Sequence, residues 1–187
     1  VRYIYKLLPF ATVQSNHDNV WGPGHELGHT HQRSIQVLGS TEFSCNLFAN
    51  LTMYKMGIYT SRGDTLGTLV NDFAEQKAWT SMLGESKMRM WWQLYLYFHM
   101  AGHDTEFYPK LFALLREDGL DTSPTHVQGD KDILHFAEKC CEAANMDLTD
   151  FFRVWGFFRP VHQRTDKEAA QRDLTVTQAM IDKTLAK

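Results

Sequence analysis

Apolar residues recur three and four positions apart along three stretches of the chain, the spacing that places side chains on one face of a helix. The stripes consist of Met88, Trp91, Trp92, Tyr95, Phe98 and His99; of Leu111, Phe112, Leu114 and Leu115; and of Ile133, Ala137, Cys140, Cys141 and Ala144. The first predicts a long helix with a wide apolar face, in which Trp91 and Trp92 pack in a core rather than line a sugar-binding groove. Pro109 suits the opening turn of the second helix, because proline lacks the amide hydrogen that is unpaired there.

Capping residues predict two further helices towards the end of the chain. Residues 148–155 favour a short helix that Gly156 ends, since glycine adopts the left-handed conformation common after a helix. Thr175, followed three residues later by Gln178, matches a capping box. This pair predicts a terminal helix that runs through Leu185.

The remaining segments complete a mainly α fold. Residues 118–130 contain Gly and Pro and predict a loop, whereas Arg2–Leu8 near the start favours a short strand. A chain of 187 residues is long enough to bury a core, and no repeat or linker divides it. We therefore expect residues 1–187 to form a single, mainly α domain with a short N-terminal strand.

Composition excludes several classes of function. The net charge of −3 and the absence of a Lys/Arg cluster argue against nucleic acid as a partner. No apolar run reaches the length of a membrane span. Three cysteines, two of them adjacent at Cys140 and Cys141, do not form a disulfide framework.

The segment Gly24–His29 contains the residues that point most directly to a chemical function. His25 and His29 are four residues apart, so on a helix both imidazoles leave the same face one turn apart. Two such nitrogens can bind one tetrahedral Zn²⁺, and Glu26 between them is placed to accept a proton from water activated by the metal. An accidental match is the alternative, in which the protein would be a structural helical domain that binds no metal.

A third protein ligand is required, and its identity separates the families of zinc peptidase. The metzincin pattern needs glycine and histidine where this chain has Gln32 and Ile35. Glu42 fits instead, in the first turn of a second helix for which Ser40 and Thr41 are suitable N-cap residues. A negative residue favoured by the helix dipole is the alternative interpretation of Glu42. His31, two residues past His29, would point away from such a centre.

Several blocks of sequence extend this pattern over nearly the whole chain. They are Trp21–Gln32, Glu42 with Asn46, Met90–Leu94, Phe107–Leu111, and Asp147–Phe152 with Trp155–Gly156. Taken in this order, the blocks resemble the catalytic domain of the enhancin-type metallopeptidases, the mucin-degrading zinc peptidases of gut bacteria and insect viruses.

The resemblance implies a ligand set and a function. It makes His25, His29 and Glu42 the zinc ligands and Glu26 the catalytic base, within the helical subdomain of a gluzincin-type peptidase. It also implies a mucin-like, O-glycosylated protein substrate, a secreted or cell-surface location, and a chain that is the C-terminal portion of a larger catalytic domain. A non-catalytic module that binds glycoproteins or glycans on the same fold is the alternative function.

One position departs from the family pattern, and one role stays unassigned. The family usually has a pair of asparagines after the ligand glutamate, whereas Cys45 precedes Asn46 here. A Cys45 thiolate near the metal is therefore a second hypothesis beside a small buried side chain. The donor that would stabilise the oxyanion is open among candidates that packing could equally explain. These candidates are Tyr95, Tyr97, His99, His103 and Tyr108.

Overall fold

The computed structural model describes residues 18–38, 40–58, 66–82, 84–120, 126–165 and 172–187, and these are mostly helical. The α-helices are α2 (Asp18–His31), α3 (Thr41–Ser44), α4 (Asn46–Lys55), α5 (Leu66–Ala74), α6 (Gly84–Tyr95), α7 (Phe107–Glu117), α8 (Ile133–Ala144), α9 (Thr149–Val154) and α10 (Gln178–Leu185). Short 3₁₀ turns form η2 (Gln32–Ile35), η3 (Trp79–Ser81) and η5 (Gly129–Lys131), and α6 continues into the π-helical turn η4 (Leu96–Met100). The mainly α fold is confirmed, and the candidate strand Arg2–Leu8 lies outside the described residues.

The three apolar stripes form α6 with η4, α7 and α8, and they pack against one another in the main core. Trp91 is fully buried, and its backbone carbonyl accepts a hydrogen bond of 2.6 Å from the hydroxyl of Tyr108 on α7. Trp92 is half-buried and stacks on Tyr95. The aromatic stripe of α6 is therefore chiefly core, as its helical spacing predicts.

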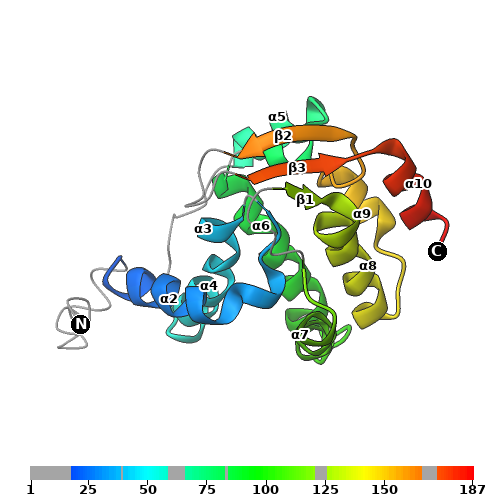
Figure 1. Ribbon diagram of the computed structural model, residues 1–187. Helices are drawn as coiled ribbons and strands as arrows, with labels where there is room; N and C mark the ends of the chain where they lie inside the picture. Colours follow the sequence, from blue (N-terminus) through cyan, green and yellow to red (C-terminus); the bar gives the residue numbers. More distant parts are fainter. Residues whose placement is uncertain (1–17, 39, 59–65, 83, 121–125, 166–171) are drawn as a thin grey trace.

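A small sheet covers one end of the helices, and the sequence analysis missed it (Figure 1). Strands β1 (His126–Gln128), β2 (Val161–Thr165) and β3 (Arg172–Val176) lie in the order β1-β3-β2, with β1 parallel and β2 antiparallel to β3. Val127 and Leu174 are register partners in the parallel pair, and both are fully buried. Burial of these apolar side chains stabilises strands that are too short to be recognised from local pattern alone.

Two predictions made from local sequence are wrong in this region. The expected loop at 118–130 contains β1, which pairs with β3 far along the chain. Thr175 lies within β3 rather than at a helix start, and Thr177 is the N-cap of α10, accepting a hydrogen bond of 3.2 Å from the Met180 amide. The sheet pairing of Thr175 thus outweighs its capping potential.

Gly156 ends α9 as predicted, and two separate observations require a glycine at this position. Its φ of +72° lies in the left-handed region. A Cβ atom at this position would also overlap the carbonyl oxygen of Lys77, which precedes η3. Glycine is therefore the residue that lets α9 pack closely against the segment leading to Trp79.

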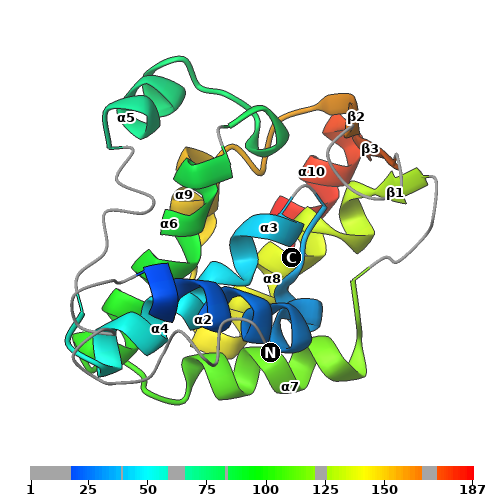
Figure 2. The same cartoon turned by 90° about the vertical axis from the view of Figure 1, so that its left-hand side faces the viewer.

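Helices α2 and α4 lie side by side, with α7 running beneath them in the view of Figure 2. Val20 and Trp21 of α2 bury their side chains with Ala49 and Met53 of α4 in a second, smaller apolar cluster. A Cβ atom at Gly28 would overlap the backbone carbonyl of Cys45, so the chains approach closely there because residue 28 has no side chain. This approach brings the start of α4 against the C-terminal part of α2.

No helix among the described segments combines the length and the apolar character needed to cross a membrane.

Replacing Gly28 with alanine is expected to destabilise the protein by about 1–3 kcal/mol, because the backbone of Cys45 must shift to admit a methyl group. Gly67→Ala is the matched control, since Gly67 is an exposed residue of α5 with open space around it. The control should be neutral or stabilising by up to about 1 kcal/mol. Urea denaturation followed by circular dichroism measures both variants, and equal stabilities would contradict the close approach at Gly28.

Candidate metal centre

Two imidazole nitrogens from α2 face one another across one helical turn. The Nε2 atoms of His25 and His29 are 3.1 Å apart, and the two rings meet edge to face. Both side chains are partly exposed. The four-residue spacing therefore places both imidazoles on the same face of α2, as the sequence predicts.

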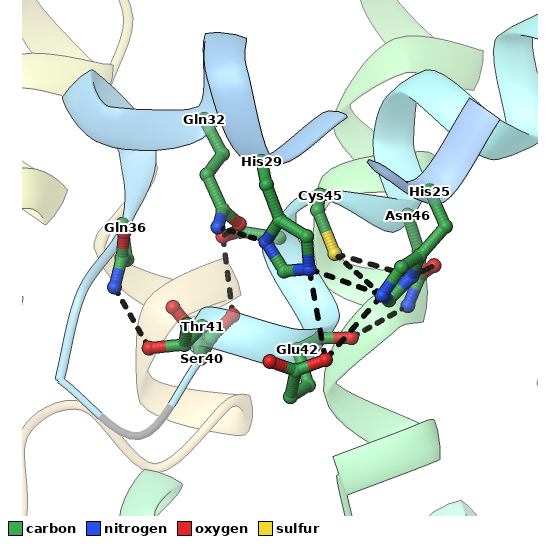
Figure 3. Close-up of polar contacts among 10 residues, drawn as sticks. His25, His29, Gln32, Gln36, Ser40, Thr41, Glu42, Cys45 and Asn46 are labelled. Carbon is green, nitrogen blue, oxygen red and sulfur yellow. Dashed lines mark hydrogen bonds and ion pairs between the residues drawn. The ribbon is translucent and has the colours of Figure 1, made fainter. Parts of the chain in front are cut away.

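Glu42 on α3 directs its carboxylate at the same two nitrogens (Figure 3). Its Oε2 atom lies 3.3 Å from Nε2 of His25 and 3.7 Å from Nε2 of His29. A tetrahedral ion with bonds of about 2.0–2.1 Å would hold its ligand atoms about 3.3–3.4 Å apart. The three atoms form a triangle of nearly that size, so these residues fit a zinc-sized ion, although their role as ligands stays a prediction.

Buried amide side chains contact the outer nitrogens of both histidines. Asn46 Oδ1 lies 2.7 Å from His25 Nδ1, and its amino group donates to the Glu42 carbonyl at 2.8 Å. Gln32 Nε2 lies 2.7 Å from His29 Nδ1. Partners of this kind fix the orientation of metal-binding imidazoles. The sequence analysis used Gln32 only to exclude the metzincin pattern, although its position three residues after His29 places the two on one helical face.

Cys45 lies against the imidazole of His25, and its sulfur is within 4.8 Å of a ring nitrogen of each of His25 and His29. The sulfur is 3.4 Å from Nδ1 and 3.9 Å from Nε2 of His25. Burial, followed by the nearby Glu42 carboxylate, raises the pKa of the Cys45 thiol to about 12. A small buried side chain and a thiolate near the metal therefore both remain interpretations of Cys45.

Glu26 is exposed and follows His25 directly on α2, where its charge also contributes to the raised pKa of Cys45. His31 is exposed, and its Nδ1 lies 3.0 Å from the Leu27 carbonyl. The prediction that His31 points away from the other two histidines agrees with this contact.

The five candidates for an oxyanion donor are held by contacts with one another and with the core. Tyr108 is buried with its hydroxyl bonded to Trp91, and His99 stacks on Tyr95 and accepts a bond of 3.4 Å from the Tyr108 amide. Tyr97 and His103 stack with ring centroids 4.2 Å apart. Packing explains these side chains, and the oxyanion donor stays unassigned.

A buried carboxylate from the other side of the fold anchors the segment between η2 and α3. Asp132 accepts a hydrogen bond of 2.9 Å from the amide of Leu38. Gln36 donates to the hydroxyl of Thr41 at 2.7 Å. Both contacts hold the chain just before Glu42, so that its carboxylate returns to α2.

Two imidazoles on α2 and a carboxylate on α3 converge, which is the arrangement expected of the ligand set of a metallopeptidase. Residues 9–156 match the model of the family described as peptidase M60, enhancin and enhancin-like, and the chain belongs to this family.

Solved structures of metallopeptidases have the same fold. A metallopeptidase in complex with Tn antigen is 39% identical over 98% of this chain, with a TM-score of 0.88. A metallopeptidase from Bacteroides thetaiotaomicron is 38% identical over 98%, with a TM-score of 0.87. This chain spans 35% and 32% of their respective lengths, about a third of each. No curated protein matches the chain.

Replacing Glu42 with alanine is expected to weaken metal binding at least about 100-fold, because one of the three converging ligand atoms is lost. Glu75→Ala is the matched control, since the Glu75 side chain is 62% exposed against 60% for Glu42. Competition against a chromophoric chelator gives both affinities for zinc. An unchanged affinity in Glu42→Ala would place the third ligand elsewhere.

Proposed function

We propose that this chain carries the centre of a zinc-dependent endopeptidase that hydrolyses peptide bonds in O-glycosylated, mucin-like proteins. The observation that carries the proposal is the convergence of His25 Nε2, His29 Nε2 and Glu42 Oε2 within 3.7 Å of one another. Glu26 follows His25 directly in the sequence. Membership of the metallopeptidase family supports the reaction class. The related metallopeptidase in complex with Tn antigen supports a glycosylated substrate.

In the proposed reaction, three residues bind the metal ion and a fourth transfers the proton. His25, His29 and Glu42 would hold the ion by three protein atoms and leave a further position open. A zinc ion bound there supplies Lewis acidity, which lowers the pKa of water towards about 7 and polarises the peptide carbonyl. Glu26 accepts a proton from the attacking water at its carboxylate and delivers that proton to the leaving amine nitrogen.

The exposure of the centre suits a macromolecular substrate. Glu26 is exposed, and the side chain of Glu42 is 60% exposed. A substrate backbone can therefore approach the ligand atoms directly, and its own bulk excludes water from the reacting carbonyl. Mucin-like substrates are found outside cells, so the proposal includes a secreted or cell-surface location.

Glu26→Gln should retain zinc and lose at least about 100-fold in the rate of cleavage, because the amide is isosteric but cannot accept the proton. Mass spectrometry of the fragments of an O-glycosylated mucin-like protein measures cleavage, and elemental analysis measures zinc per chain. Glu117→Gln, at the exposed end of α7, is the control that should leave both unchanged. Full activity in Glu26→Gln would overturn the assignment of the base.

The same experiment separates the peptidase from a binding module. A zinc-loaded chain that binds the glycoprotein without cleaving it would favour a non-catalytic glycoprotein-binding function. A chain that binds no zinc would favour an accidental motif.

A further inference from the structure

Gln32 connects one ligand histidine to the helix that carries Glu42. Its side chain is 2% exposed and lies at the junction of α2 and η2. Gln32 Nε2 is 2.7 Å from His29 Nδ1, while Ser44 Oγ, on α3, donates to Gln32 Oε1 at 2.6 Å. Ser44 Oγ has a single hydrogen to donate, and it also lies 3.1 Å from the Ser40 carbonyl, its alternative acceptor. A continuous polar chain thus runs from His29 through Gln32 and Ser44 to a backbone carbonyl. Figure 3 shows its first contact, between His29 and Gln32.

The direction of the hydrogen bonds in this chain depends on where His29 carries its proton. An amide amino group at Nδ1 suits an imidazole whose proton is on Nε2, the nitrogen that faces His25 and Glu42. A metal ion on Nε2 instead requires the proton on Nδ1, and Nδ1–H needs an acceptor. A 180° turn of the amide exchanges its oxygen and nitrogen at nearly the same positions and supplies that acceptor.

With the amide turned, every donor and acceptor between His29 and the Ser40 carbonyl has a hydrogen-bond partner. Gln32 then accepts from His29 Nδ1–H through Oε1 and donates to Ser44 Oγ through Nε2. The Ser44 hydroxyl donates its hydrogen to the Ser40 carbonyl, which can only accept. Because Gln32 and Ser44 are buried, an unsatisfied bond in this chain would carry a large desolvation penalty.

We propose that Gln32 is a positioning residue that, with Ser44, holds His29 in the Nδ1–H form and so keeps its Nε2 lone pair directed at the metal. The role rests on the proposed function only in requiring that His29 binds zinc. Gln32 also links α2 to α3, so it fixes the separation between the His29 and Glu42 ligand atoms as well as the orientation of the ring.

The test compares zinc affinity, measured by chelator competition, in Gln32→Leu, Gln32→Glu and the unchanged chain. Gln32→Leu should bind zinc about 10–100-fold more weakly, the usual effect of losing such a partner. Gln32→Glu keeps an acceptor for Nδ1–H and should restore affinity to within about threefold. Gln178→Leu is the control, because Gln178 lies on α10 and bonds to Asp182, without touching a ligand residue or the segment before Glu42.

A second measurement distinguishes positioning from simple packing. In the zinc-loaded chain, the His29 Nδ1 proton should exchange slowly with solvent by long-range ¹H–¹⁵N spectroscopy, and Ser44→Ala should accelerate this exchange and weaken zinc binding. These two effects decide the proposal if Gln32→Leu does not fold.

The outcomes separate this inference from the proposed function. Zinc binding by the unchanged chain, with the same affinity in Gln32→Leu or with no effect of Ser44→Ala, overturns the positioning role alone. An equal loss in Gln32→Leu and Gln32→Glu overturns it as well. Failure of the unchanged chain to bind zinc overturns both.

Discussion

The close approach of α2 to the start of α4 is the constraint on which the rest of the centre depends. At Gly28 the two backbones leave no room for a Cβ atom, and Gly28 lies between Glu26 and His29. The contact places Cys45 and Asn46 against α2, and Glu42 is only three residues before Cys45. This backbone packing brings the three proposed ligand residues close together. Their side chains are then long enough to bring His25 Nε2, His29 Nε2 and Glu42 Oε2 into a triangle.

The parts of the centre that follow from local geometry could be predicted from the sequence, whereas those that depend on distant contacts could not. Helical spacing alone brings His25 to His29, and the short connection returns Glu42 to them. The extent of α2 could not be foreseen, because Gly22, Pro23 and Gly24 all disfavour a helix interior, yet the helix includes them and packs on α4. The sheet was missed because β1 has three residues and pairs with a strand far along the chain.

The centre has an exposed outer layer of side chains and a buried inner layer, and the two layers have different roles. Glu26 and Glu42 are exposed, and in the proposed function this leaves them open to a polypeptide substrate and to a proton-transfer step. Gln32, Ser44 and Asn46, which hold the ligands from behind, are each at most 4% exposed. In that environment of low dielectric, each hydrogen bond is stronger and a missing partner is more costly, so orientation is fixed on the side away from the substrate.

Asp132 connects the segment before Glu42 to helix α8. Its carboxylate binds the amide of Leu38, 94 residues away in the sequence, and Asp132 is also the N-cap residue of α8. An ion that binds only the folded arrangement stabilises every segment that must be in place for binding. Under the proposed metal binding, metal occupancy and the local opening of α8 would be linked equilibria, and chelation would lower the free energy needed to expose the first turn of that helix to solvent.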